Sequence, residues 1–140
     1  MRGQSHFCIA WYLLDPGGQA VMPDIPISAG DKITIVLRAS SGTSATVTIH
    51  NHTKGHSKTN SLSSSHPFCR NQAMWFIGVP EDNVLPGFGM VEIMGAKATG
   101  VATGTQEAGR GELWNMVNHT TTLITTSHAS DFSTLIFKQD

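Results

Sequence analysis

The sequence has few charged residues and no long apolar run. Charged residues make up 14% of the 140-residue chain, and the formal net charge is −1. Lysine and arginine form no cluster and do not alternate with aromatic residues, so the sequence offers no electrostatic basis for binding nucleic acid. No stretch approaches the roughly eighteen consecutive apolar residues that a membrane-spanning helix needs, which argues against a membrane protein. The length fits a single domain over residues 1–140.

Cysteine is also scarce, since Cys8 and Cys69 are the only two. A disulfide between them would stabilise the fold by roughly 4 kcal/mol in the chain-entropy model. Two reduced, buried cysteines are the alternative, and the sequence leaves both open. The N-terminal apolar run contains Trp11 and Tyr12 and ends in an Asp-Pro-Gly-Gly turn without a small-residue cleavage site. We interpret this run as a strand and not as a signal peptide, which would leave the chain in the cytoplasm if Met1 is the true start.

Serine and threonine are abundant instead, and together they number 28. Short runs alternate apolar and polar residues, and no eleven-residue segment has helical periodicity. About eight or nine short strands, with turns roughly every eight to twelve residues, predict an all-β sandwich or barrel. We expect residues 54–66 to form a surface loop or a frayed strand, and residues 95–111 to be rich in turns. The other predicted strands or extended pieces are residues 7–14, 20–26, 32–39, 45–51, 73–77, 84–88, 90–94, 112–118, 121–126 and 132–138.

The densest apolar run lies within residues 69–78. In an extended conformation, Trp75 and Ile77 point to one side and Met74 and Phe76 to the other. A strand that is apolar on both faces is usually central in a sheet. We therefore predict that residues 73–77 form a central strand buried on both faces.

Three neighbouring histidines invite a metal-site interpretation. No carboxylate or cysteine accompanies them, so solvent-facing histidines are the better interpretation. We expect neither a metal nor any other cofactor. The histidines are His50, His52 and His56.

Two further short patterns have chemical meanings. Ser127, His128 and Asp131 are the residue types of a hydrolytic triad, but they lie in a polar turn without the glycines of a nucleophile elbow, so we do not predict a triad. Asn51 and Asn118 each begin an Asn-His-Thr sequence that matches the N-glycosylation acceptor pattern, which matters only in the secretory path.

Taken in order, the segments resemble the glutamic peptidases, or eqolisins. These are acid-active fungal endopeptidases with a lectin-like (concanavalin A-like) sandwich of two antiparallel sheets, and the resemblance covers nearly the whole chain. It implies a secreted hydrolase that acts on polypeptides by proteolysis. The landmarks that carry the resemblance are Ala10-Trp-Tyr12 before an acidic turn, Ile25-Pro-Ile-Ser-Ala-Gly-Asp31, the strand of residues 32–37, Cys69 with Ala73 and Trp75, Phe88-Gly89, Ala96-Lys-Ala98, Trp114-Asn-Met-Val, Leu123-Ile-Thr-Thr, and residues 132–137.

In that family a glutamate is the general base that activates the attacking water, and a glutamine from an earlier strand stabilises the oxyanion. Where the family has Ala-Glu-Trp, this chain has Ala73-Met74-Trp75. The resemblance therefore places a thioether, which cannot accept the proton, at the base position. It places the glutamine ahead of Met1, and Gln4 is at the wrong distance. We expect the C-terminal two-thirds of a glutamic peptidase-like domain, without its first strands and without both catalytic residues.

Three functions remain open on the sequence. The first is a catalytically impaired relative, or pseudoenzyme, that retains a substrate groove lined by Trp11, Tyr12 and Trp75. The second is an active acid peptidase that uses Glu81 or Glu92 as a substitute carboxylate, although an outward-facing Glu92 is the better interpretation. The third is a carbohydrate- or peptide-binding sandwich without catalysis, because a fold does not fix a function. Missing strands would expose unpaired backbone, so we also expect self-association through exposed strands.

Overall fold

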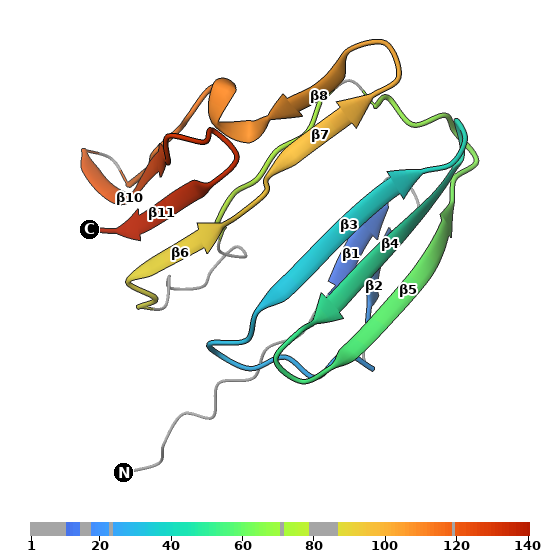
Figure 1. Cartoon of the computed structure of the whole chain (residues 1–140), viewed down its shortest axis with the longest axis horizontal. Helices are drawn as coiled ribbons and strands as arrows, with labels where there is room; N and C mark the ends of the chain where they lie inside the picture. Colours follow the sequence, from blue (N-terminus) through green and yellow to red (C-terminus); the bar gives the residue numbers. More distant parts are fainter. Residues whose placement is uncertain (1–10, 15–17, 23, 71, 79–86, 119) are drawn as a thin grey trace. The chain divides into compact units, whose positions relative to one another are not determined.

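The computed structural model describes residues 11–14, 18–22, 24–70, 72–78, 87–118 and 120–140. Its regular structure within these ranges is β-strand, apart from one short 3₁₀ turn. The chain forms two compact units, Met1–Cys69 and Arg70–Asp140, and each is described below by itself (Figure 1). The single domain over residues 1–140 depends on how these units are arranged, and it stays a prediction.

The first unit contains a hairpin and a three-stranded antiparallel sheet. The hairpin pairs β1 (Trp11–Leu14) with β2 (Gly18–Val21). The sheet has the order β3-β4-β5, formed by β3 (Ile33–Ala39), β4 (Ser44–Asn51) and β5 (His56–Ser63). The hairpin of β3 and β4 confirms the expectation from the alternation in residues 32–39 and 45–51.

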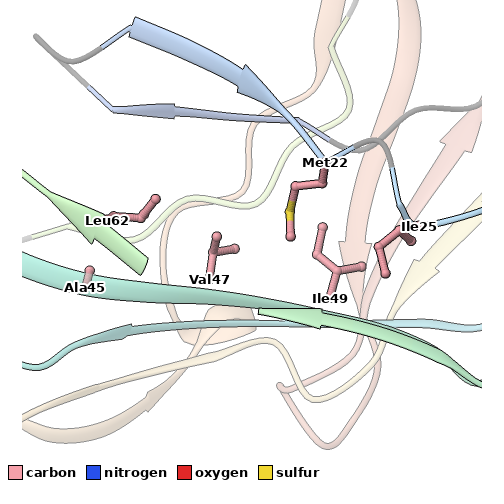
Figure 2. Packing of buried hydrophobic residues seen from close by; sticks show 6 residues of the cluster. All are labelled: Met22, Ile25, Ala45, Val47, Ile49 and Leu62. Carbon is pink, nitrogen blue, oxygen red and sulfur yellow. The ribbon is translucent and has the colours of Figure 1, made fainter. Parts of the chain in front are cut away.

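One face of this sheet forms the core of the first unit. Val47 and Ile49 on β4 and Leu62 on β5 are buried together with Met22 and Ile25, which follow β2 in the chain. Figure 2 shows the side chains of Met22 and Ile25 meeting those of the sheet residues. Burial of each such apolar side chain contributes roughly 1.5–3 kcal/mol of transfer free energy. The alternation of β4 therefore has a direct energetic cause, because three of its four buried residues are the apolar Ala45, Val47 and Ile49, and the fourth is Asn51.

The strand β5 is longer and more regular than the sequence indicated. All eight of its residues pair with β4, where a loop or a frayed strand was the expectation. Its serine and threonine side chains contribute little apolar burial, but pairing satisfies its backbone groups. Thr48 and Thr59 also hydrogen-bond across the two strands, with 2.8 Å between their hydroxyl oxygens. Pairing with β4 therefore orders a segment whose own pattern is weak.

The second unit is built on a four-stranded antiparallel sheet with the order β6-β11-β10-β9. A two-stranded hairpin and a 3₁₀ turn lie between β6 and β9 in the sequence. The core of the unit contains the buried side chains of Ala96, Ile124, Leu135 and Phe137. The elements are β6 (Met90–Ile93), β7 (Lys97–Gly100), β8 (Gly104–Glu107), η1 (Ala108–Arg110), β9 (Met116–Asn118), β10 (Thr121–His128) and β11 (Leu135–Gln139).

The expectation for residues 95–111 was incomplete. This glycine-rich segment contains the paired strands β7 and β8 as well as turns. Gly95 and Gly104 have φ angles of 66° and 67°, a region that favours glycine. Its glycines therefore mark the starts and ends of short strands, in addition to the turns.

The turn between β10 and β11 is fixed by Asp131. Its Oδ1 accepts hydrogen bonds from the backbone N–H groups of Thr134 at 3.0 Å and Ser133 at 3.1 Å. These bonds, the Thr134 backbone bond first, lower the pKa of Asp131 below the ordinary 3.8. The next residue, Phe132, has a φ of 55°, and its carbonyl accepts a 2.7 Å hydrogen bond from the N–H of Gly109. The turn is thus held locally by an aspartate and from outside by a buried glycine.

Candidate functional site

Residues 72–78 have no regular secondary structure and belong to none of the described sheets. Trp75 and Ile77 are partly buried and pack against the core cluster of the second unit. Met74 and Phe76 are 78% and 73% exposed. The alternation of partly buried and exposed side chains agrees with the prediction. The prediction of a central strand that is buried on both faces is wrong. The described residues cover one face of the segment only, and a strand becomes central only when neighbours pair with both of its edges.

Met74 occupies the position on which the catalytic argument depends. Trp75 beside it anchors the segment to the core, and this leaves the Met74 side chain exposed to solvent. A thioether is a weak hydrogen-bond acceptor and takes up no proton in water. Two residues further on, the ring of Phe76 lies against Gly78, where an added Cβ would be only 3.2 Å from Phe76 Cε2. The exposed side chains of Met74 and Phe76 are therefore apolar, and neither is an acid or a base.

The three aromatic groove candidates come from both units. Trp11 and Tyr12 are successive residues of β1 in the first unit. Trp75 belongs to the second unit, where it is partly buried against the core. A groove lined by all three depends on how the units are arranged, and it stays a prediction.

Of the two candidate substitute carboxylates, the structure describes Glu92 and not Glu81. Glu92 lies on β6 opposite Ile136 and is exposed. Along β6 it alternates with Val91 and Ile93, which pack against the core. Glu92 therefore faces outward, as expected. Glu81 lies outside the described residues.

Two of the three neighbouring histidines, His50 and His52, are in contact in the structure. The rings of His50 and His52 lie 4.2 Å apart between centroids in an edge-to-face arrangement. The Oγ1 atom of Thr34 lies 2.7 Å from Nε2 of His52. His56 is exposed at the start of β5. In the part of the chain that the structure describes, no group of three or more His, Cys, Asp or Glu residues is placed to hold a metal ion.

The three triad residue types do not meet as a triad. Asp131 accepts its hydrogen bonds from Ser133 and Thr134, within its own turn. The Nδ1 atom of His128 is 2.8 Å from the carbonyl oxygen of Ala129, and its ring stacks near that of Phe132. These contacts explain the conformations of both residues without any nucleophile.

Cys69 is exposed. The alternative of two buried thiols is therefore wrong for this residue. Cys8 lies outside the described residues, so the Cys8–Cys69 disulfide stays a prediction.

Asn51, which the sequence indicated only as a glycosylation pattern, is a buried polar residue with three hydrogen bonds from its side chain. Asn51 has an exposed fraction of 0%, and its Nδ2 donates to Asp31 Oδ2 at 2.7 Å and to the Pro26 carbonyl at 2.8 Å. Its Oδ1 accepts the Lys54 backbone N–H at 3.0 Å. Asp31 also accepts the Ser28 N–H at 2.8 Å. The Asn51 bond is the first cause that lowers the pKa of Asp31 below 3.8.

This polar node explains two features of the sequence. It ties the end of the Ile25–Asp31 landmark to the end of β4 through Asp31 and Asn51. It also uses the Asn51 amide that the glycosylation pattern would need, so the folded chain does not offer this site for modification. One signal was available, because Asn51 continues the alternation that buries Val47 and Ile49.

A sequence model of the peptidase A4 family matches residues 2–138. The chain belongs to this family. No curated protein matches the chain in a sequence search. Within the described residues, no helix is long and apolar enough to cross a membrane.

Two solved structures of glutamic peptidases are similar to this peptidase A4 chain. Aspergilloglutamic peptidase from Aspergillus niger aligns over 94% of this chain and 79% of its own, with 25% identity and a TM-score of 0.80. Scytalido-glutamic peptidase, solved with a peptide-based transition state analog, aligns over 94% of this chain and 69% of its own, with 19% identity and a TM-score of 0.64. The resemblance to the glutamic peptidases is thereby confirmed. The all-β fold class, the antiparallel sandwich of these peptidases, is confirmed by the same matches.

Proposed function

We propose that this member of the peptidase A4 family is catalytically impaired and binds polypeptides without hydrolysing them. The observation that carries the proposal is the exposed thioether of Met74 between Ala73 and Trp75. General acid–base catalysis contributes about 10²–10⁴-fold to a rate and needs a group that exchanges a proton near the working pH. Met74 supplies none. This argument does not depend on where the sequence begins, because Met74 lies well inside the chain.

The neighbouring residues support the binding half of the proposal. Met74 and Phe76 expose apolar surface, while the alternate residues Trp75 and Ile77 pack against the core. An exposed apolar row on a fixed segment is a surface on which the side chains of an unfolded polypeptide can pack. By its family the protein would meet such substrates outside the cell, and secretion from a fungal host would test this location.

The test is cleavage of an acid-denatured protein by the purified chain at acidic pH. We expect no cleavage by the wild type and retention of the denatured protein in a binding assay. Cleavage by the wild type would overturn the proposal, and loss of that cleavage in Glu81→Gln or Glu92→Gln would identify the substitute base.

Two variants locate the position of the missing base. Met74→Glu places a carboxylate at the family's base position, and Phe76→Glu places one on the same exposed face two residues away. Cleavage gained by the first and not by the second would identify position 74 as the base position. If both are inert, catalysis lacks a second group as well, and the description of the wild type as impaired still stands.

Binding of a carbohydrate is the alternative function. The fold is compatible with it, but none of the described contacts favours it over polypeptide binding. Retention of the chain on a glycan column, with no retention by denatured protein, would favour the alternative.

A further inference from the structure

Two histidine side chains share one face of the first sheet at the end of β4. His50 lies in β4 opposite Thr34 of β3. His52 follows β4, and its backbone N–H donates to the Lys32 carbonyl at 2.9 Å, so the pairing with the chain before β3 continues to this residue. Residues two apart along an extended chain point to the same face of a sheet. The pairing therefore holds the two imidazole rings side by side, with 4.2 Å between their centroids.

Each ring has a nitrogen that is available to a shared ligand. The Nε2 atom of His52 lies 2.7 Å from Oγ1 of Thr34. When Nε2 carries the hydrogen and donates it to this hydroxyl, the lone pair of Nδ1 stays free, and an outer bond of this kind orients a metal-ligating histidine. Within the described ranges, the ring of His50 contacts His52 and takes part in no hydrogen bond.

The distance between the rings suits a common metal ion. Imidazole nitrogen binds zinc at about 2.0–2.1 Å, so two rings that share one such ion have their centres roughly 5 Å apart. The observed 4.2 Å is close to this value, and rotation about the side-chain bonds supplies the difference. His52 is exposed and His50 is partly buried, so an ion can approach the pair in the folded unit.

The neighbouring strands determine which ion the pair can accept. On β5, Ser57 is the residue opposite His50. Lys32 is the charged residue opposite His52, and the nearby carboxylate of Asp31 is already bonded to the side chains of the buried Asn51 and of Lys54. The pair therefore offers two imidazoles without a carboxylate. This ligand set does not suit Ca²⁺ or Mg²⁺, which prefer oxygen ligands.

We propose that His50 and His52 form a binding site for a divalent transition metal ion such as Ni²⁺, Cu²⁺ or Zn²⁺. Imidazole suits these ions, and water fills their remaining coordination positions. Because the site has half the protein ligands of a structural zinc site, its dissociation constant should be of roughly micromolar to submillimolar order. Cu²⁺ should bind most tightly of the three. The proposal does not depend on the proposed function.

The experiment is calorimetric titration of Ni²⁺ into the untagged full chain at about pH 7.5. We expect His50→Gln and His52→Gln each to weaken binding about tenfold or more, because each removes one of the two ligands. His56→Gln is the matched control and should leave binding unchanged, since His56 lies opposite Asn51 and therefore on the other face of the sheet. Cys69→Ser should also leave it unchanged, which excludes the exposed thiol as the ligand.

Two further measurements depend on the chemistry and the geometry of the pair. Metal binding should weaken about tenfold or more between about pH 7.5 and pH 5, because a metal ion binds only the neutral imidazole. Ni²⁺ at about 1 mM should raise the melting temperature of the wild type, because the sheet holds the two rings together only in the folded chain. Neither His50→Gln nor His52→Gln should show this rise. Lys32→Gln should tighten binding severalfold, since it removes a positive charge beside the ion.

Three results would overturn the proposal. A wild type that binds no Ni²⁺ at about 1 mM would exclude a site of the expected affinity. Binding that persists in both His50→Gln and His52→Gln would place the ion elsewhere on the chain. Binding without any rise in melting temperature would mean that the unfolded chain binds the ion equally well, so that the sheet does not build the site.

Discussion

An aspartate fixes a turn in each unit, but the two act over different distances. Asp31 in the first unit is bonded to Asn51, twenty positions away, and forms an ion pair with Lys54 at 3.2 Å. Asp131 in the second unit bonds only within two to three positions along the chain, to Ser133 and Thr134. The first aspartate therefore connects separate segments of the fold, whereas the second shapes one turn. A local device can form before the rest of the unit is folded, and a long-range device cannot.

The largest effect is expected in the core of the second unit. Phe137 is 3% exposed, and Phe137→Ala should lower the free energy of unfolding by about 3–5 kcal/mol. The measurement is chemical denaturation followed by tryptophan fluorescence. Its exposed neighbour Lys138 supplies the control, since Lys138→Ala should change the stability by about 0.5 kcal/mol at most. Equal effects of the two substitutions would contradict the burial of Phe137 in the core of this unit.

The second-largest loss of stability is expected at the polar node of the first unit. Asn51→Ala removes a hydrogen-bond partner of the Pro26 carbonyl, of Asp31 Oδ2 and of the Lys54 N–H. This loss should lower the free energy of unfolding by about 2–3 kcal/mol. Asn60→Ala on β5 is the matched control and should cost well under half as much. If Asn51→Ala is as mild as its control, the node does not connect the segments as described.

Glycine substitutions give a third comparison of the two units, through the space that an added methyl group would find. A Cβ on Gly109 would lie 2.7 Å from the Phe132 carbonyl oxygen and 2.8 Å from His128 Cβ, so Gly109→Ala should cost about 1–3 kcal/mol. Gly42 in the first unit has nothing within 4 Å of an added Cβ and no positive φ. Gly42→Ala should therefore change the stability by about 0.5 kcal/mol or less. Thermal denaturation of both variants checks the difference.

The pH dependence compares the two aspartates directly. The pKa of each lies below 3.8 in the folded chain, for Asp31 mainly because of Asn51 and for Asp131 mainly because of Thr134. Each lowered pKa contributes stability that is fully present above the unfolded value of about 4 and is lost as the pH falls through the folded value. Asp31→Asn and Asp131→Asn should each flatten the fall in melting temperature below about pH 4.

Near neutral pH, Asp31→Asn should destabilise the chain more than Asp131→Asn, because it disconnects segments that are far apart in the sequence. Melting temperatures over the acid range, recorded for both variants beside the wild type, would decide this. The reverse order would contradict the distinction between the long-range and the local aspartate.

Several elements followed from local pattern, and others did not. Residues 33–39 and 44–51 alternate strongly, so their strands and their hairpin were predictable. Residues 56–63 are polar, and β4 beside them makes them a regular strand. The dense apolar run of residues 73–77 led to the opposite error, because a central strand was predicted where the structure has none. Apolar content alone does not provide strands that pair with such a run.

The sequence by itself determined the β character, the alternation along β4 and the resemblance to the glutamic peptidases. From that resemblance it predicts that Met74 stands at the base position. These features depend on neighbouring residues, or on the order of motifs along the chain. Only the tertiary structure decided that Asn51 is buried and bonded, that one face of residues 72–78 is covered, and that Met74 is exposed. Covering a face and satisfying a buried amide both require segments that lie far away in the chain, and a period of two residues carries no information about which segments those are.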